Sequence, residues 1–212
     1  MKQYSKIAVI GGTGKSGSYL VKELIRQGFN FKVLLRNTDN FQIKNSLIEI
    51  VKGDAREYSS VYSLLEGCST VISTLGQPKG EPSIFSQASR NVISAMNELG
   101  IRRYIVTTGL NVDTPQDKKS PKTKFATDWM KTNYTETTFD KQEEFNILSG
   151  SDIDWTLVRL PLIDLTDEER QVIIKTEDCP GDRISATSLA HFLVKQLDDT
   201  TYIKKAPFIA NA

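Results

Sequence analysis

The sequence predicts an α/β domain built on a doubly wound, mainly parallel sheet with helices on both faces. Three observations point to this class. A short apolar run at 7–10 leads through a glycine-rich turn directly into a helical pattern. Strand-like and helical patterns then alternate as far as Arg159, which is the order that builds parallel strands. The 212 residues contain no repeat, low-complexity stretch or linker, so we expect one domain spanning 1–212.

The glycine-rich turn at 11–17 is typical of dinucleotide binding. A backbone without Cβ atoms can approach a pyrophosphate closely, and the first N–H groups of the following helix point at its negative charge. A nucleoside-triphosphate P-loop would need a glycine at position 9, where Val9 stands, so that reading fails. A turn without a ligand remains the alternative. The predicted contacts are Gly11, Thr13, Gly14, Lys15, Ser16 and Gly17, the last of which also lets the helix pack closely on the sheet.

A second strand, expected at 31–36, ends at Arg36. Sheets of this class commonly carry an acidic residue near this point, which binds the ribose 2′-hydroxyl. A guanidinium can instead pair with a 2′-phosphate through charged hydrogen bonds. Arg36 therefore favours NADP(H) over NAD(H), with an ordinary surface arginine as the alternative.

The third and fourth strands, 48–54 and 70–75, supply further cofactor contacts at their carboxyl ends. We expect the turn at Asp54 and Ala55 to lie beside the adenine pocket; Asp54 can also cap the next helix, 58–66. The end of the fourth strand would face the inner ribose and phosphates. Its predicted contacts are Ser73, Thr74, Leu75 and Gly76.

A helix is expected at 82–99, with a proline in its first turn, and a fifth strand at 103–108. Thr107 and Thr108 place hydroxyls at the end of that strand, where hydride chemistry takes place in doubly wound folds; ordinary β-branched strand residues are equally consistent. Farther on, four residues recur with the spacing of a short amphipathic helix: Phe125, Trp129, Met130 and Tyr134. We expect this stripe to be packed core, with the lid of a flat-substrate pocket as the alternative.

The remaining pattern predicts a helix at 139–148, a strand at 154–159, an edge strand at 171–175, a helix at 186–197 and a last strand at 206–210. Ser185 and Thr187 are both candidates to cap the helix at 186–197. His191 lies inside that helix and is a poor general base, because the helix should pack away from the strand ends.

Composition excludes several classes of function. There are 27 Lys and Arg against 26 Asp and Glu, so we expect no nucleic-acid or membrane partner. The basic cluster at 118–124 is expected to be a solvated loop. Two cysteines and one histidine cannot form a structural zinc site or a disulfide framework. The absence of a 20-residue apolar run or a signal-peptide core at 1–6 leads us to expect a cytoplasmic protein.

Four stretches together carry a family resemblance: 11–17, 33–36, 151–161 and 183–190. With them the chain resembles the atypical short-chain dehydrogenases/reductases, and among these the small NAD(P)H-binding group of biliverdin and flavin reductases, NADH-flavin reductases and NmrA-like proteins. The resemblance implies a Rossmann domain of about seven strands with a minimal substrate lobe from 111–135 and 160–185. It also implies that the nicotinamide lies near Thr107 and Thr108. The backbone of Pro161, Leu162 and Ile163 would hold its carboxamide.

The chain departs from the family at the catalytic pair. The superfamily uses Tyr-x-x-x-Lys, and alignment places Lys141 at the lysine position but Thr137 at the tyrosine position. A threonine hydroxyl is too weak an acid to replace the phenol. Lys141 would then hold the nicotinamide ribose, and Tyr134, one turn earlier, is a candidate proton donor. Lys141, Thr108 and Tyr134 are the predicted catalytic residues.

These observations favour an NADP(H)-dependent oxidoreductase that transfers hydride to a planar acceptor such as a flavin or quinone, for which water can supply protons. A flavin would be a substrate of this protein. The alternative is an NmrA-like dinucleotide sensor without turnover, which the missing tyrosine also supports. A sugar-nucleotide isomerase or epimerase is disfavoured because little chain follows Arg159 to build a substrate lobe. We expect a monomer or small homo-oligomer.

Overall fold

The structure, a computed structural model, describes residues 6–39 and 41–212. Its helices are α1 (Gly17–Arg26), α2 (Tyr58–Leu65), α3 (Phe85–Leu99), α4 (Pro121–Asn133), α5 (Thr135–Ser149) and α6 (Ala186–Lys195). Its strands are β1 (Lys6–Ile10), β2 (Phe31–Leu35), β3 (Ile48–Lys52), β4 (Cys68–Ser73), β5 (Arg103–Gly109), β6 (Asp154–Leu160), β7 (Leu162–Asp164), β8 (Val172–Lys175), β9 (Arg183–Ser185) and β10 (Phe208–Asn211).

The described residues form an eight-stranded sheet in the order β3-β2-β1-β4-β5-β6-β10-β8. All neighbours are parallel except β8, which pairs antiparallel with β10 at one edge. The predicted fold class is therefore confirmed, with one strand more than the seven expected. The strand order reverses between β1 and β4, and this reversal opens a crevice at the carboxyl ends of the strands.

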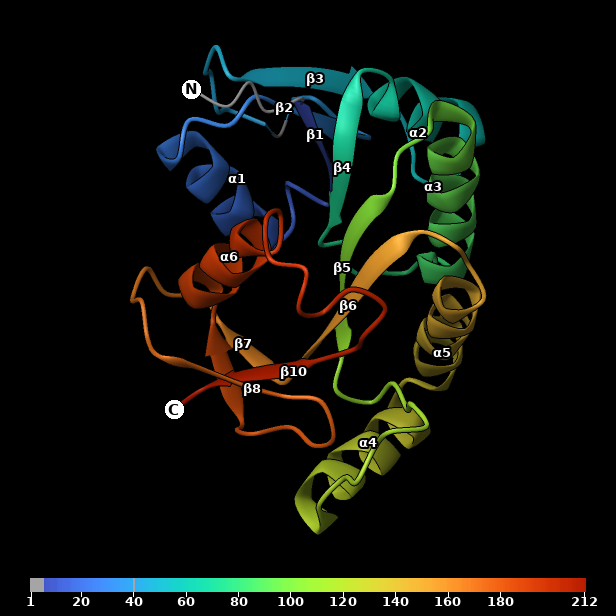
Figure 1. The fold of residues 1–212 in the computed structure, drawn as a ribbon, viewed down its shortest axis with the longest axis vertical. Coiled ribbons are helices and arrows are strands. Elements are labelled where there is room, and N and C mark those ends of the chain that lie inside the picture. Colours follow the sequence, from blue (N-terminus) through green and yellow to red (C-terminus); the bar gives the residue numbers. More distant parts are fainter. Residues whose placement is uncertain (1–5, 40) are drawn as a thin grey trace.

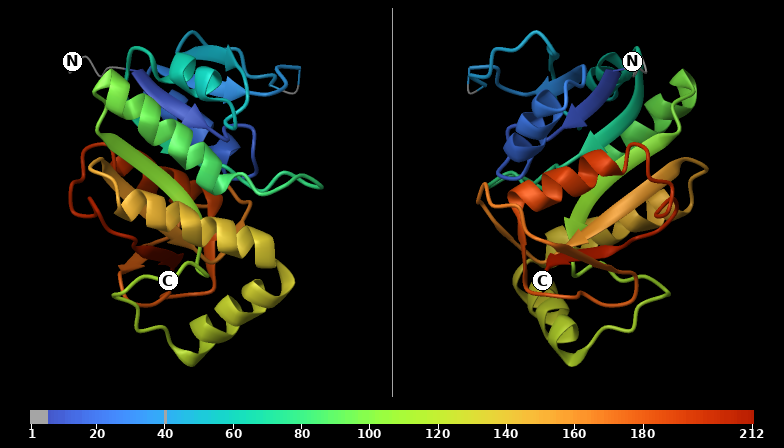
Figure 2. Two further views of the ribbon diagram at one scale, coloured as in Figure 1. Left: turned by 90° about the vertical axis from the view of Figure 1, so that its right-hand side faces the viewer. Right: turned by 60° about the vertical axis from the view of Figure 1, so that its left-hand side comes forward.

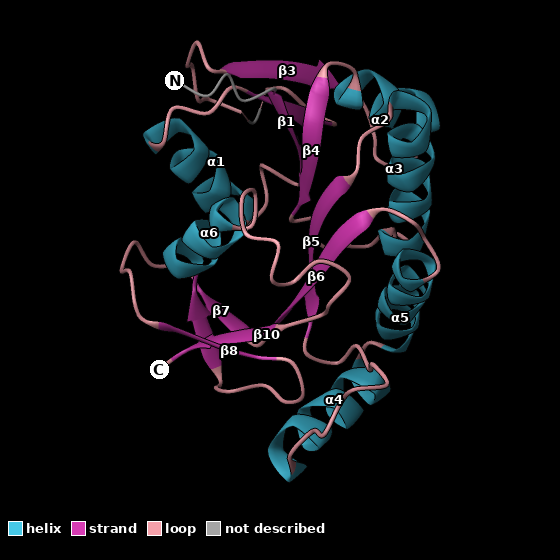
Figure 3. Cartoon of the chain, in the orientation of Figure 1, coloured by secondary structure: helices cyan, strands magenta, loops and turns pink. Residues whose placement is uncertain are grey.

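Helices cover both faces of the sheet, as Figures 1 and 3 show. α1 and α6 lie side by side on one face, while α2, α3 and α5 line the other. Each face buries its own apolar cluster. Leu20, Leu24 and Leu193 belong to the first, and Val92, Met96 and Leu148 to the second. These two cores hold the strand ends rigidly against each other.

α3 begins at Phe85, three residues later than predicted, because a side chain from α5 defines its start. Asp140 accepts hydrogen bonds from the amide of Phe85 at 2.7 Å and from the hydroxyl of Ser83 at 2.6 Å. It also accepts one from the amide of Ser86 at 3.3 Å. A carboxylate at a helix N-terminus satisfies amides that have no partner within the helix. Pro82 thus lies before the helix.

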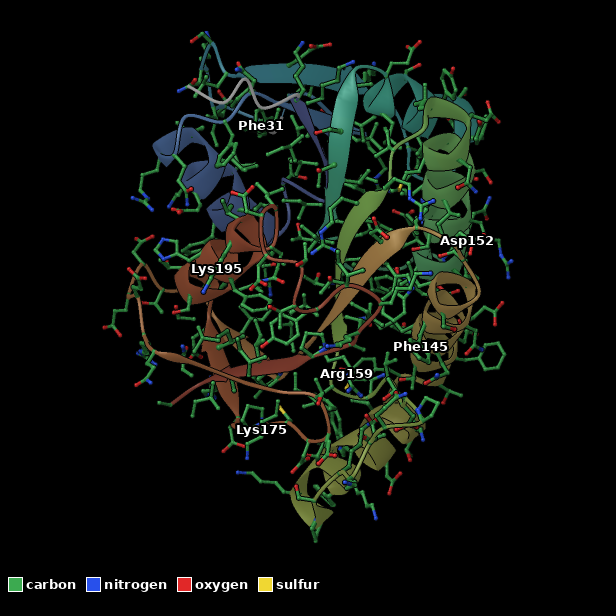
Figure 4. The ribbon with its side chains drawn as sticks, in the orientation of Figure 1. Phe31, Phe145, Asp152, Arg159, Lys175 and Lys195 are labelled. Carbon is green, nitrogen blue, oxygen red and sulfur yellow. The ribbon has the colours of Figure 1, made fainter. Side chains whose placement is uncertain are left out.

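Arg159 on β6 is fully buried and joins the carboxyl end of the sheet to the loops around it (Figure 4). Its guanidinium donates to Asp117 at 2.7 Å and to backbone oxygens of residues 112, 176 and 206 at 2.8 to 3.1 Å. It also lies 3.5 Å from the ring centroid of Phe208. Burial lowers the pKa of Arg159, although Asp117 opposes that change. The network is complete enough to hold a buried charge.

α4 projects from the body of the molecule beyond the end of α5 (Figures 1 and 2). The prediction of packed core for its aromatic stripe is wrong. Phe125 is 73% exposed, and Trp129 and Tyr134 are about half exposed, at 49% and 52%. The amphipathic spacing was real, but only part of the opposite face packs, since Thr123 and Thr127 are the buried residues of this helix.

The basic cluster at 118–124 is the expected solvated loop only in part, because Lys118 and Lys122 are exposed whereas Lys119 is buried and α4 starts at Pro121. Lys119 is buried and donates to Asp113 at 2.6 Å and to the carbonyl oxygen of Val112 at 3.2 Å. Pro121 then starts α4, with Ser120 as its cap. The lysines are therefore partly structural, because buried ammonium groups need paired acceptors.

The C-terminal region differs from the prediction at two places. β7 and β9 form a separate two-stranded parallel sheet that the sequence did not predict. Ser185 caps α6 by accepting from the amide of Ser188, so Thr187 is not the cap. The expectation about a signal peptide rests on residues 1–5, which lie outside the described residues. Across the described residues, no helix has the length and apolar character needed to cross a membrane.

Candidate functional site

The carboxyl ends of β1, β2 and β4 surround a cleft of about 700 Å³ at the point where the strand order reverses. Ligands of open parallel sheets bind in this position. Many of the residues predicted to contact a cofactor line it. They are Gly11, Thr13, Gly14, Lys15, Ser16, Arg36, Asp54, Ala55, Thr74, Leu75 and Gly76. The structure thus brings together segments that are up to 65 positions apart in sequence.

The glycine turn is shaped by close backbone contacts. Gly11 has a φ of +80°, and its carbonyl accepts a hydrogen bond from the amide of Gly14 at 2.9 Å. The hydroxyl of Thr74 lies 3.3 Å from the same carbonyl oxygen. A Cβ on Gly17 would overlap that oxygen, so Gly17 is required for packing. Gly17 is buried and does not line the cleft, nor does Ser73.

The N-terminus of α1 opens toward this turn and suits an anion. Ser16 precedes the helix, but its side chain caps no amide among the described residues, and no acidic residue stands in the first turn. The amides of Ser18 and Tyr19 already donate to the carbonyl oxygens of Gly14 and Ser16, at 3.0 and 3.1 Å. The donors available to an anion are therefore the amides of residues 15–17, at the positive end of the helix. Because Gly14 has no side chain to shield them, a phosphate group can reach these amides.

At the other end of the cleft, four side chains form what we call the charge cluster: Arg36, Asp54, Arg56 and Glu81. Arg36 Nη1 donates to both carboxylate oxygens of Glu81, at 2.9 and 3.0 Å. Arg56 lies 3.2 Å from Asp54 through Nη1 and 2.8 Å from Glu81 through Nη2. Arg36 is half exposed at the lip of the cleft. Its role as a ligand of a 2′-phosphate stays a prediction.

Asp54 does not cap α2, contrary to one of its two predicted roles. Its carboxylate accepts from the amide of Arg56 at 2.9 Å, while Glu57 precedes the helix without a capping hydrogen bond among the described residues. Asp54 instead closes a local turn and faces Arg56. This arrangement leaves it on the cleft wall, where the other predicted role, contact with the adenine, remains a prediction.

At the end of β5, Thr107 and Thr108 are both buried and lie outside the cleft lining. The Thr107 hydroxyl donates to the carbonyl oxygen of Ser73 at 3.4 Å, a strand-to-strand contact. The Thr108 hydroxyl has no hydrogen-bond partner among the described residues, and neither has the buried side-chain nitrogen Nδ2 of Asn111. Buried polar atoms without partners are rare, so this strand end has hydrogen-bonding capacity for a ligand.

Lys141 lies on α5 outside the cleft lining, with its ammonium 4.6 Å from the ring centroid of Phe85. Burial lowers the pKa of Lys141, and nearby Glu144 and Asp140 oppose the change. Burial likewise raises the pKa of Glu144 to about 8, although a hydrogen bond from Ser89 opposes it. The half-buried lysine therefore lies beside the buried pair of Glu144 and Ser89, between α3 and α5. Its predicted role at the nicotinamide ribose stays a prediction.

The other predicted residues of the nicotinamide end are also outside the cleft. Tyr134 separates α4 from α5 and contacts Trp129 edge-on, with ring centroids 5.7 Å apart. Leu162 and Ile163 belong to β7, and the amide of Leu162 already donates to the carbonyl oxygen of residue 182. Pro161 is buried just before them. Their proposed contact with a carboxamide would have to use the groups that this pairing leaves free.

Sequence reasoning missed Arg56 and Glu81. Arg56 follows the Asp54-Ala55 turn directly and could have been noticed as a second cation near Arg36. Glu81 gives no such signal, because it stands in a proline- and glycine-rich loop 45 positions from Arg36. Only the folded chain brings the two together.

Comparison with known protein families identifies the family to which a chain with this cleft belongs. The model of the family described as NAD(P)H-binding matches residues 11–200, which is most of the chain. The chain belongs to the NAD(P)H-binding family. That range runs from the first glycine of the turn to beyond α6 and includes every residue of the cleft and of the charge cluster except Ile10.

Two curated relatives of this chain are named as reductases. It is 31% identical over 140 residues to phenylcoumaran benzylic ether reductase 1 of Arabidopsis thaliana, covering 60% of this chain and 43% of that protein. It is 24% identical over 129 residues to cinnamoyl-CoA reductase 1 of Petunia hybrida, covering 55% and 39%. The chain therefore spans less than half the length of these relatives.

Solved structures share the fold over nearly the whole chain. An anaerobillin reductase from Escherichia coli O157:H7 superposes with a TM-score of 0.80 at 17% identity, covering 97% of each chain. A short-chain dehydrogenase/reductase from Veillonella parvula, solved in complex with NADP, gives 0.77 at 13% identity, covering 98% of this chain and 95% of that one. The resemblance to atypical short-chain dehydrogenases/reductases is thus confirmed at the level of fold.

Proposed function

We propose that this protein is a reductase that binds NADPH in preference to NADH and transfers hydride to a planar acceptor such as a flavin or a quinone. The observation that carries the proposal is the cleft itself. A glycine turn and an uncapped helix start lie at one end of it, and Arg36 lies at the other. A pyrophosphate and a 2′-phosphate need donors of these two kinds.

In this proposal the protein's residues bind and orient the cofactor. The amides after Gly14 hold the diphosphate, and Arg36 holds the 2′-phosphate. The unpaired hydroxyl of Thr108 offers a hydrogen bond at the end of β5. When bound, the reduced nicotinamide would supply the hydride. Fixing both reactants in one orientation is then the main catalytic contribution of the chain.

The proposed acceptor follows from the absence of the tyrosine that the superfamily uses as a proton donor. Thr137 stands where the superfamily has its tyrosine, and Tyr134 lies on the exposed surface beside Trp129. A flavin or quinone can take its proton from water, whereas reduction of an isolated carbonyl gains much more from a positioned acid.

Steady-state oxidation of NADPH with flavin mononucleotide and with a soluble quinone tests the proposal. We expect turnover with at least one acceptor, and a higher kcat/KM for NADPH than for NADH. The matched control is Arg102→Ala, which removes an exposed arginine just before β5, at the end of the strand opposite the cleft, and should leave both values unchanged. Equal kcat/KM values for the two nucleotides would contradict the proposed preference.

A dinucleotide sensor is the second candidate, and the position of Lys141 favours it. The ammonium lies against Phe85, between α3 and α5, instead of lining the cleft. A chain that binds NADPH tightly but oxidises it with no acceptor would support the sensor and overturn the reductase.

A further inference from the structure

Two arginines from different strand ends converge on one carboxylate beside the cleft. Arg36 follows β2, Arg56 follows β3, and both reach Glu81 in the loop between β4 and α3. The contact from Arg56 Nη2 is a charge contact at 2.8 Å without hydrogen-bond geometry, so this buried nitrogen has no directed acceptor among the described residues. Glu81 thus satisfies Arg36 well and Arg56 poorly.

The loop that carries Glu81 also forms part of the cleft wall. Gly76, Gln77 and Pro78 line the cleft, and Glu81 follows Gly80, which has a φ of +74°. Within the loop, the side-chain amide of Gln77 donates to the carbonyl oxygen of Glu81 at 2.8 Å. Glu81 itself is 39% exposed. The local bond thus holds the backbone of the loop, whereas the carboxylate is held only by the two arginines among the described residues and can leave them without breaking the core.

The charges of the cluster balance only while Glu81 is in place. Arg36 and Arg56 face the carboxylates of Asp54 and Glu81, so the four side chains together carry no net charge. Hydrogen bonding from Arg36 lowers the pKa of Glu81, which keeps the carboxylate ionised at neutral pH. If Glu81 withdraws, the cluster gains a net positive charge at the lip of the cleft. A phosphate monoester has the charge and the acceptor oxygens to replace it.

We propose that Glu81 occupies, in the free protein, the place that the 2′-phosphate of NADPH takes in the complex, and that Arg56 is a second ligand of that phosphate beside Arg36. This inference rests on the proposed function. Its new content is that the carboxylate and the phosphate compete for the same two guanidinium groups. A nucleotide without the 2′-phosphate offers no anion to replace Glu81.

The competition can be measured without turnover, by calorimetric titration of the full chain with adenosine 2′,5′-bisphosphate and with 5′-AMP. Glu81→Gln should bind the bisphosphate about two- to fivefold more tightly, because a partly exposed ion pair no longer opposes binding. Arg56→Gln should weaken bisphosphate binding by about tenfold. Neither change should alter the affinity for 5′-AMP by more than about twofold.

The matched control is Glu57→Gln, which makes the same substitution one residue after Arg56 at a carboxylate that bonds to Ser60. It should leave the ratio of the two affinities unchanged. If Glu81→Gln leaves that ratio unchanged or weakens the bisphosphate, Glu81 is a structural anchor of the loop and the inference is overturned. If the parent chain binds neither nucleotide, the proposed function fails as well.

Discussion

The two halves of the sheet differ in where their charged side chains lie. Around β1 to β4, the backbone turn and the charge cluster open onto a cleft, and the helix start carries no capping side chain among the described residues. Around β5, β6 and β10, charged side chains are turned inward. Arg159 and Lys119 are buried in networks with Asp117 and Asp113.

This difference indicates that one half of the sheet is suited to ligand binding and that the other contributes mainly to stability. Satisfied buried networks rigidify a structure, whereas groups with unused hydrogen-bonding capacity are available to a ligand. The first half thus presents donors on the wall of a cleft, where a ligand can reach them. In the second half, Thr108 and Asn111 hold the unpaired buried polar atoms closest in sequence to the end of β5. The following changes test this division, from the largest expected effect to the smallest.

Replacing Arg159 with Met should lower the free energy of unfolding by about 3–5 kcal/mol, because it leaves Asp117 and three carbonyl groups without their buried donor. Urea denaturation measures this loss. Arg183→Met removes an exposed arginine that pairs with Asp164 and should cost less than about 1 kcal/mol. Equal losses for the two variants would contradict the structural role assigned to Arg159.

Gly17→Ala should destabilise the protein by about 1–3 kcal/mol, because the new methyl group overlaps the Gly11 carbonyl oxygen and forces α1 away from the turn. Nucleotide affinity should fall with it. Gly150→Ala at the end of α5 is the control, since a Cβ there meets its nearest contact, the carbonyl oxygen of Asn146, at the ordinary distance of 3.4 Å, away from the cleft. If Gly17→Ala has the stability of the parent protein, the prediction is contradicted and α1 can lie farther from the Gly11 carbonyl without cost.

Arg36→Ala should weaken NADPH binding about tenfold or more while changing NADH binding little, because only NADPH carries the 2′-phosphate. Fluorescence titration of the two reduced nucleotides gives both constants. Lys79→Ala, which removes an exposed cation from the neighbouring loop, should affect neither. Equal losses for NADPH and NADH would remove the case for 2′-phosphate recognition.

Glu144→Gln should flatten the dependence of stability on pH. The pKa of Glu144 rises in the folded protein from 4.5 to about 8, so its stabilising effect is complete below pH 4.5 and is lost as pH rises toward 8. Chemical denaturation at pH 5 and pH 8 should show a smaller drop for the variant than for the parent. Lys141 acts in the opposite direction, since burial lowers its pKa, and a steeper drop in the variant would contradict this assignment.

The sequence was most informative where function depends on local backbone geometry. The glycine turn and Arg36 were identified because strand, turn and helix follow one another without interruption. Contacts between residues far apart in the sequence could not be predicted in this way. Asp140 caps α3 from another helix, and Glu81 meets Arg36 only across the folded cleft. The stripe on α4 shows a further limit, because amphipathic spacing predicts a helix face but not what covers it.

Calorimetric titration of the purified chain with NADPH and NADH tests the central claim most directly, which is that the cleft between β1 and β4 binds a pyridine dinucleotide. We predict one binding site, measurable heat from both nucleotides and a lower Kd for NADPH. If neither NADPH nor NADH gives heat, the proposed cofactor is contradicted, and with it both the reductase and the sensor.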